Sequence, residues 1–383
     1  MGVQNMNKIF PKLTASVSKN LRIWGPPLAI LVSSRILVFL SGRFGTRHIP
    51  FDYTAERMVS APAWFRWDAA FYLDIATHGY GADYSTAFFP LYPLLGHIAS
   101  RASGFPIHLT LLVLANVFFI LAVLVLFDLV RREWNDETAL VAVAGLSFFP
   151  STVFLSAGYA ESLFLLLALI TFRYLHDGKV WSAAFFAGLA SASRPLGFLL
   201  ALSVVVDSIL RTRNHSGRTV ICSLLLGLVS VWGLLGYAGY LGLTFGHPLM
   251  FASAQFLWHG PVEPLWGHMP WRMVQLVVTS GSREAMVNGV FFLSFTVLTL
   301  LGVRLLPARY TVFSIGALCL LYWRAPYVLF FSANRHVLSI VPVYLTLAVL
   351  LSRRMGYALA VIGISAGLSV FWTALYVQGY LIR

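Results

Sequence analysis

Apolar stretches long enough to cross a lipid bilayer recur along the whole of this sequence. A helix needs about 20 predominantly apolar residues to span the hydrocarbon core of a membrane. Charged residues, which would interrupt such stretches, make up only 11% of the chain, whereas soluble domains carry about 25%. The sequence therefore predicts an all-α polytopic membrane protein and excludes a soluble globular fold.

The apolar stretches predict about eleven transmembrane helices. The first, from about Trp24 to Leu40, is too long for a cleaved signal peptide and lacks a small-residue cleavage site. Arg194 and Pro195 interrupt the run at 180–210, which leaves two readings: one kinked helix or two short ones. The other spans are expected at about 108–130, 137–153, 160–176, 219–243, 285–303, 310–326, 333–351 and 355–377.

The basic residues predict how the chain is oriented. Lys and Arg accumulate in the cytoplasmic loops of membrane proteins, so the net charge of +13 does not indicate a nucleic-acid partner. With a cytoplasmic N-terminus and two short helices in 180–210, all four lysines fall on the cytoplasmic side: Lys8, Lys12, Lys19 and Lys179. In this arrangement 42–107 and 244–284 are the two large external loops of a single domain, 1–383.

The first external loop holds the densest cluster of aromatic and charged residues, between Trp64 and His78. Four residues share one stripe at helical spacing: Trp67, Phe71, Ile75 and His78. The segment is too short and too charged to cross a bilayer. It predicts an amphipathic helix lying at the outer interface. Asp68 lies early in this helix, either as a functional acid or as a charge that favours the helix start.

A segment rich in proline and aromatic residues, Ala87 to Leu95, follows in the same loop. Pro90 and Pro93 predict that no regular helix starts here, because proline lacks the N–H donor and clashes with a preceding turn. The segment is expected either as a rigid wall for an apolar substrate or as the entry into the next span. Composition alone favours the entry.

Ionisable residues at the outer ends of predicted spans are further candidates for a functional site. Glu161 heads an otherwise apolar helix, where it is either a functional acid or an ordinary charge of the first turn. Arg335 stands beside His336 at the head of another span, and Arg194 precedes a proline. Arg offers a bidentate, permanently charged partner for phosphate, although a single Arg at this depth often only reaches lipid headgroups.

The motifs together resemble a known family. The residues that carry the resemblance are Arg66-Trp-Asp68, Ala87-Phe-Phe-Pro-Leu-Tyr-Pro-Leu94, Phe149-Pro-Ser with Ser156, Tyr159-Ala-Glu-Ser-Leu163, Ser193-Arg-Pro-Leu-Gly197 and the sequence around Arg335. In this order they resemble the PIG-V family, whose eukaryotic members add the second mannose of GPI and whose bacterial relatives mannosylate other lipids. The loop with His247 and Gln255 is similar to one of the bacterial members, and the short chain favours a bacterial source. Where Arg-Tyr is expected in the late motif, this sequence has Arg335-His336.

The resemblance implies a GT-C fold glycosyltransferase with its catalytic centre on the external face of a bacterial plasma membrane. It implies inverting transfer of mannose from a polyprenyl-phosphate donor to a hydroxyl of a lipid or glycolipid acceptor, with Asp68 as general base. Arg335, His336 and Arg194 are expected at the donor phosphate. The residues expected at the substrates are Arg66, Trp67, Asp74, Tyr92, Tyr159, Glu161, His247 and Gln255.

No cofactor, resident metal or obligate protein partner is expected, because a lipid-phosphate sugar already carries its leaving group. Membrane lipids and the two lipid substrates are the expected partners. Two alternatives stay open from the sequence. A lipid-phosphate transporter or scramblase would use the same cations without chemistry, and a related GT-C enzyme would transfer another sugar.

Overall fold

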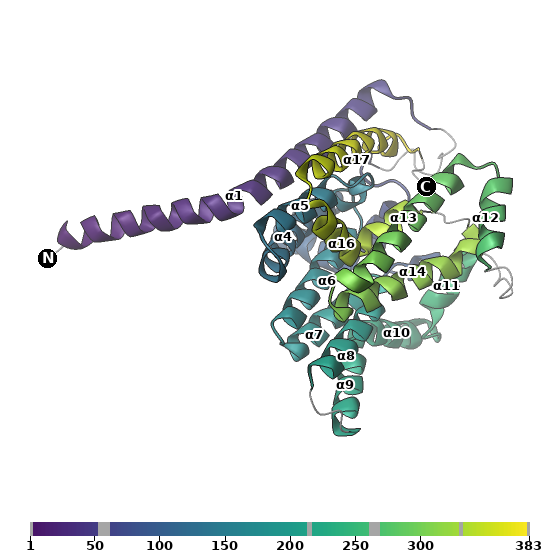
Figure 1. Cartoon of the computed structure of the whole chain (residues 1–383). Coiled ribbons are helices and arrows are strands. Elements are labelled where there is room, and N and C mark those ends of the chain that lie inside the picture. The colour runs from purple at the N-terminus through teal and green to yellow at the C-terminus, as the bar shows by residue number, and fades with distance from the viewer. Residues whose placement is uncertain (1–2, 53–61, 213–216, 260–268, 329–331, 381–383) are drawn as a thin grey trace.

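The computed structural model describes residues 3–52, 62–212, 217–259, 269–328 and 332–380, and in these ranges the chain forms helices and no strands. Figure 1 shows a helical bundle from which the N-terminal part of α1 (Val3–His48) projects, while α17 (Met355–Tyr376) lies along the other part. The remaining α-helices are α2 (Asp68–His78), α3 (Leu91–Ser103), α4 (Ile107–Glu133), α5 (Asp136–Ser147), α6 (Glu161–His176), α7 (Val180–Ser191), α8 (Leu200–Arg211), α9 (Gly217–Val229), α10 (Trp232–Phe245), α11 (Met250–His259), α12 (Pro270–Thr279), α13 (Arg283–Leu305), α14 (Ala308–Val328), α15 (Ala333–His336) and α16 (Val341–Leu351). Short 3-10 helices are η2 (Tyr84–Ala87), η3 (Thr152–Leu155), η4 (Pro195–Leu199) and η6 (Val337–Ser339).

Four helices of the described chain are long and apolar enough to cross a membrane: Arg22–His48 within α1, α4, α13 and α17. Two bent pairs meet the same test together, so the number rises to six if each pair is one span. The predicted all-α polytopic membrane protein is thus confirmed. The predicted count of about eleven spans is not, because the helices α5 to α8 have only 12 to 16 residues each.

The segment 180–210 forms two short helices rather than one kinked helix. α7 ends at Ser191, and η4 begins at Pro195, which fits a first helical position because no N–H is needed there. Arg211, at the end of α8, donates from Nη2 to the backbone oxygen of Leu175 at 2.5 Å. This bond brings the end of α8 back to the start of α7, next to Lys179, as the distribution of positive charge predicts.

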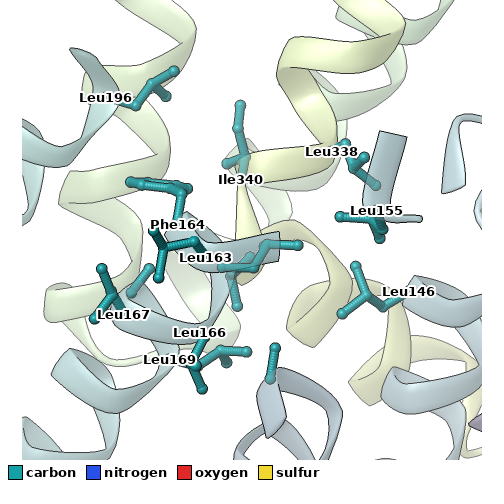
Figure 2. Packing of buried hydrophobic residues seen from close by; sticks show 14 of the residues in the cluster. Leu146, Leu155, Leu163, Phe164, Leu166, Leu167, Leu169, Leu196, Leu338 and Ile340 are labelled. Atoms are coloured by element: carbon teal, nitrogen blue, oxygen red, sulfur yellow. The ribbon is translucent and has the colours of Figure 1, made fainter. Parts of the chain in front are cut away.

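Helix α6 lies in the interior of the bundle. Its residues from Glu161 to Leu169 are all buried, which is the pattern of a helix surrounded by other helices. Figure 2 shows Leu163, Phe164 and Leu167 of α6 among side chains from other segments, including Leu196, Leu338 and Ile340. The first residue of α6, Glu161, is therefore an interior residue, not an exposed helix cap.

The predicted span 333–351 is broken, with an angle of 80° between Ala333–Ser339 and Val341–Leu351. Pro342 stands in the first turn of α16, and a proline cannot continue a helix that arrives from the preceding turn. The short arm before the bend carries Arg335 and His336. The predicted span 219–243 is broken too, by 52° between α9 and α10.

The segment 42–107, predicted as the first external loop, holds a helix start where none was expected. Helix α3 begins at Leu91, directly after Pro90, and holds Pro93 in its first turn. The expectation that these prolines prevent a helix start is wrong, because proline is tolerated in a first turn, where its N–H would have no helical partner.

The buried face of α2 also differs from the predicted stripe. Ile75 of the predicted stripe is buried, but His78 is exposed, and the other buried residues are Ala69, Tyr72 and Ala76. Contacts with α3 and α4 cover this buried face.

Candidate active site

Four charged side chains, each from a different part of the sequence, meet in one cluster. Arg335 on α15 donates from Nη1 to Asp68 Oδ2, at the start of α2, over 2.5 Å. The Nε of Arg335 donates to Oε1 of Glu161, the first residue of α6. Arg194, between α7 and η4, brings Nη1 to 2.6 Å from the same Glu161 oxygen. The structure therefore joins four of the residues that the sequence singles out, and we call them the charge cluster.

The members of the charge cluster differ in exposure. The side chain of Glu161 is fully buried, those of Arg194 and Arg335 are 5% and 9% exposed, and that of Asp68 is 36% exposed. Two carboxylates face two guanidinium groups, so the buried charges balance, as buried ions must. Asp68 is the one member that a substrate can approach from outside.

Aromatic rings and backbone groups hold Arg335 in place. Its guanidinium carbon lies 4.4 Å from the ring centre of Tyr159 and 5.3 Å from that of Phe154. Ser151 donates to the backbone oxygen of Asn334 at 3.0 Å, and the backbone N–H of Asn334 donates to the Asn288 side chain at 3.0 Å. The short helix α15 is thereby fixed on both sides.

The residues predicted at the donor phosphate lie next to each other. His336 follows Arg335 on α15 and is half-buried. Its Nδ1 lies 3.4 Å from Nη2 of Arg194. The guanidinium groups of Arg194 and Arg335 and the imidazole of His336 therefore lie close together.

The backbone directly before Asp68 is strained. Trp67 has φ 55° and ψ −127°, a conformation that favours glycine. Such a residue costs about 1–3 kcal/mol and persists only where its surroundings hold it. Here the carbonyl oxygen of Arg66 accepts hydrogen bonds from the hydroxyls of Tyr159, at 2.8 Å, and Tyr376, at 3.2 Å. The Arg66 side chain also donates from Nε to the backbone oxygen of Val377 at 3.2 Å.

Two buried polar atoms beside this turn have no hydrogen-bond partner among the residues that the structure describes. They are Nε1 of Trp67, a donor, and Oε2 of Glu161, an acceptor. Buried polar groups almost always have a partner, so these two are suited to a substrate hydroxyl.

The other predicted substrate residues make contacts elsewhere. Asp74 pairs with His78 at 2.7 Å, and its side chain is 65% exposed. Tyr92 is buried and donates to Leu111 O at 2.9 Å. Gln255 donates to the backbone oxygen of Ala87 at 3.1 Å, and His247 is exposed. Among the residues that the structure describes, no hydrogen bond or ion pair joins these four side chains to the charge cluster.

Two residues near the charge cluster, Tyr72 and Tyr376, are not among the candidates that the sequence predicts. Burial raises the pKa of Tyr72 above its ordinary value, the nearby Glu161 adds to this, and Arg194 and Arg335 oppose it. Tyr72 is therefore a neutral phenol in the field of the cluster, and its position four residues after Asp68 on one helix face is a signal that could have identified it. Tyr376 ends an apolar helix, where tyrosine is common in any membrane protein, so the sequence offers no signal for it.

The arrangement can bind an anion and accept a proton side by side. The arginines supply fixed positive charge, and Asp68 supplies a reachable carboxylate. In the part of the chain that the structure describes, no three His, Cys, Asp or Glu side chains gather as a metal site.

Comparison with known proteins finds similarity to mannosyltransferases. Residues 48–231 match the family model described as Mannosyltransferase (PIG-V), a range that includes Asp68, Glu161 and Arg194 but not Arg335 or Tyr376. The human GPI alpha-1,6-mannosyltransferase 2 is 29% identical over 291 residues, which cover 68% of this chain and 57% of that protein. The Schizosaccharomyces pombe GPI mannosyltransferase 2 is 28% identical over 138 residues, or 35% of this chain and 30% of that protein. The matches thus span little more than half of the human relative and less than a third of the fission-yeast one.

A solved structure has a similar fold. The oligosaccharyltransferase of Archaeoglobus fulgidus in its apo form superposes with a TM-score of 0.50 at 13% identity, over 93% of this chain and 56% of that one. At this identity the likeness concerns the fold alone, and it confirms the expected GT-C architecture. The family match, the relatives and the fold agree: this chain has a GT-C-type helical fold and is similar in sequence to the PIG-V mannosyltransferases.

Proposed function

We propose that this protein transfers mannose from a polyprenyl-phosphate donor to a hydroxyl of a lipid-linked acceptor, with Asp68 as general base. The observation that carries the proposal is the pairing of Asp68 with Arg335 at 2.5 Å, at the exposed edge of an otherwise buried cluster. A base and a phosphate-binding cation held side by side are the two groups that this reaction needs. The match to a mannosyltransferase family supports the choice of sugar.

The reaction makes one glycosidic bond, breaks one bond to the phosphate oxygen and transfers one proton. The acceptor oxygen attacks the anomeric carbon, its proton passes to the Asp68 carboxylate, and the bond from that carbon to the phosphate oxygen breaks. The electron pair leaves with the polyprenyl phosphate, whose charge Arg335, His336 and Arg194 stabilise. Attack opposite the leaving group inverts the anomeric centre and gives an α-linkage from a β-linked donor. Trp67 Nε1 and Glu161 Oε2 are the proposed partners of sugar hydroxyls.

We also infer that the site faces the outside of a bacterial plasma membrane, with the N-terminus in the cytoplasm. The support is charge at the other end of α6, about 24 Å from Glu161 for its 16 residues. There Arg309 pairs with Glu133 and, at 3.4 Å, with Asp207. Arg173 pairs with Asp128 at 2.8 Å at the same end. Basic residues favour the cytoplasmic side, so the opposite end, with the charge cluster, is external.

The test compares Asp68→Asn with wild type, using purified protein, labelled polyprenyl-phosphate mannose and a lipid extract as acceptor. General-base catalysis is worth about 10²–10⁴-fold, so the variant should lose at least about a hundredfold in kcat. The matched control is Asp136→Asn, because Asp136 also begins a helix and also pairs with an arginine, Arg131, at 2.7 Å. The control should keep normal turnover.

Either of two results would refute the proposal. Normal turnover by Asp68→Asn would remove Asp68 from the mechanism. Donor bound but never consumed by wild type would favour a lipid-phosphate transporter or another sugar.

A further inference from the structure

We propose that Tyr376, together with Tyr159, is a positioning residue that holds the strained turn at Trp67 and thereby aims Asp68 at the acceptor. The inference rests on the proposed function for its catalytic meaning. Its structural basis is the Arg66 carbonyl oxygen, which receives both tyrosine hydroxyls, at 2.8 Å and 3.2 Å. Tyr376 lies outside residues 48–231, the range matched by the family model.

The two hydroxyls act on the peptide group that sets the direction of the turn. The Arg66 oxygen belongs to the peptide bond that joins Arg66 to Trp67, the residue with φ 55°. The same oxygen accepts the backbone N–H of Ala69 at 3.2 Å, within the first turn of α2. Holding this oxygen therefore fixes both the strained residue and the start of the helix. Asp68 lies between the two, so its carboxylate follows the orientation of this peptide.

The tyrosines come from two rigid segments. Both are fully buried, and their rings pack edge-on against Phe154, at 5.1 Å for Tyr159 and 5.7 Å for Tyr376. Phe154 belongs to η3 and also faces the guanidinium of Arg335, at 5.3 Å. One aromatic group thus connects the residues that hold the Asp68 turn with the residue that pairs with Asp68.

The end of α17 is itself held against α1. A Cβ added to Gly45 would lie 2.3 Å from the backbone oxygen of Ala374, so the two helices touch through their backbones. After α17, the Gln378 side chain donates to the backbone oxygens of Gly45, at 2.8 Å, and Ile49, at 2.6 Å. These contacts fix the position of Tyr376, which lies between Ala374 and Gln378, relative to the turn at Trp67.

The experiment removes only the hydroxyls, with Tyr159→Phe, Tyr376→Phe and the double variant, which all keep the packed rings. Loss of one hydroxyl should lower kcat about tenfold and loss of both about a hundredfold, the scale expected for a misplaced catalytic group. The KM for the donor should not change, because the phosphate-binding side chains are untouched. Hydrogen–deuterium exchange should rise in the peptide that contains the Ala69 and Ala70 amides.

The matched control is Tyr237→Phe. Tyr237 is 3% exposed, and its hydroxyl donates to the backbone oxygen of Thr86 at 2.9 Å, away from the charge cluster. This control should keep wild-type kcat and wild-type exchange at Ala69. A double variant that matches the control in both measurements would overturn the inference, and so would a loss confined to the donor KM.

The exchange measurement separates this inference from the proposed function. If wild type transfers no mannose, the proposed function fails, but faster exchange at Ala69 in the double variant still supports the hold on the turn. If wild type transfers mannose and exchange at Ala69 is unchanged in the double variant, the positioning role is overturned while the proposed function stands.

Discussion

Replacing Glu161 with Gln tests whether one buried carboxylate keeps the charge cluster together. A single oxygen of Glu161, fully buried, receives both Arg194 and Arg335. Glutamine keeps the size of the side chain but removes its charge, which leaves two nearly buried guanidinium groups with Asp68 alone to balance them. Removing one partner of a buried ion pair costs about 3–5 kcal/mol. The midpoint of thermal unfolding should therefore fall by about 4–6 °C for a chain of 383 residues.

The assay is thermal unfolding of the purified protein in detergent, followed by tryptophan fluorescence. Glu137→Gln is the matched control, because Glu137 also lies in the first turn of a helix but is exposed. Glu161→Asp keeps the charge on a shorter side chain and should fall between wild type and Glu161→Gln. Should Glu161→Gln unfold at the same temperature as Glu137→Gln, the buried carboxylate does not hold the two arginines.

Two further substitutions test the packing around the site. Gly45→Ala should destabilise the protein by about 1–3 kcal/mol and lower kcat, because the new Cβ meets the Ala374 backbone; Gly25→Ala on the same helix has open space and should be neutral in thermal unfolding and in transfer assays. Arg309→Met should cost about 3–5 kcal/mol in the same unfolding assay, because it leaves two nearly buried carboxylates without their shared cation. Arg131→Met, which breaks an exposed pair, should cost less than about 1 kcal/mol, and equal losses for the two arginines would contradict the assignment of burial.

Much of the helical pattern follows from hydrophobicity, while the breaks do not. The predicted run 160–176 agrees closely with α6 (Glu161–His176), because an apolar stretch between polar ends defines both of its limits. The 52° bend between α9 and α10 lies inside a continuous apolar run, so no change of composition announces it. The start of α3 does not follow from composition, because Pro90 directly before the helix and Pro93 in its first turn are both compatible with a helix start.

The candidate site was predictable residue by residue but not as an arrangement. Asp68, Glu161 and Arg335 each stand out as charges at the ends of apolar segments. The sequence leaves Glu161 either as a functional acid or as a helix cap. Its burial and its two arginine partners decide for an interior role, and both depend on the packing of distant helices. Tyr376 could not be distinguished from an interfacial anchor, because its role arises from a hydrogen bond across 310 positions of the chain.

That long separation has a consequence for the order in which the protein is made. The Arg66 segment leaves the ribosome 310 residues before Tyr376, an interval of roughly 15–60 s at 5–20 residues per second. Throughout this interval Asp68 has already been synthesised, yet the Tyr376 hydroxyl that bonds to the turn before it has not. Docking of α17 against α1 is therefore the step that brings this hydroxyl to the Arg66 carbonyl.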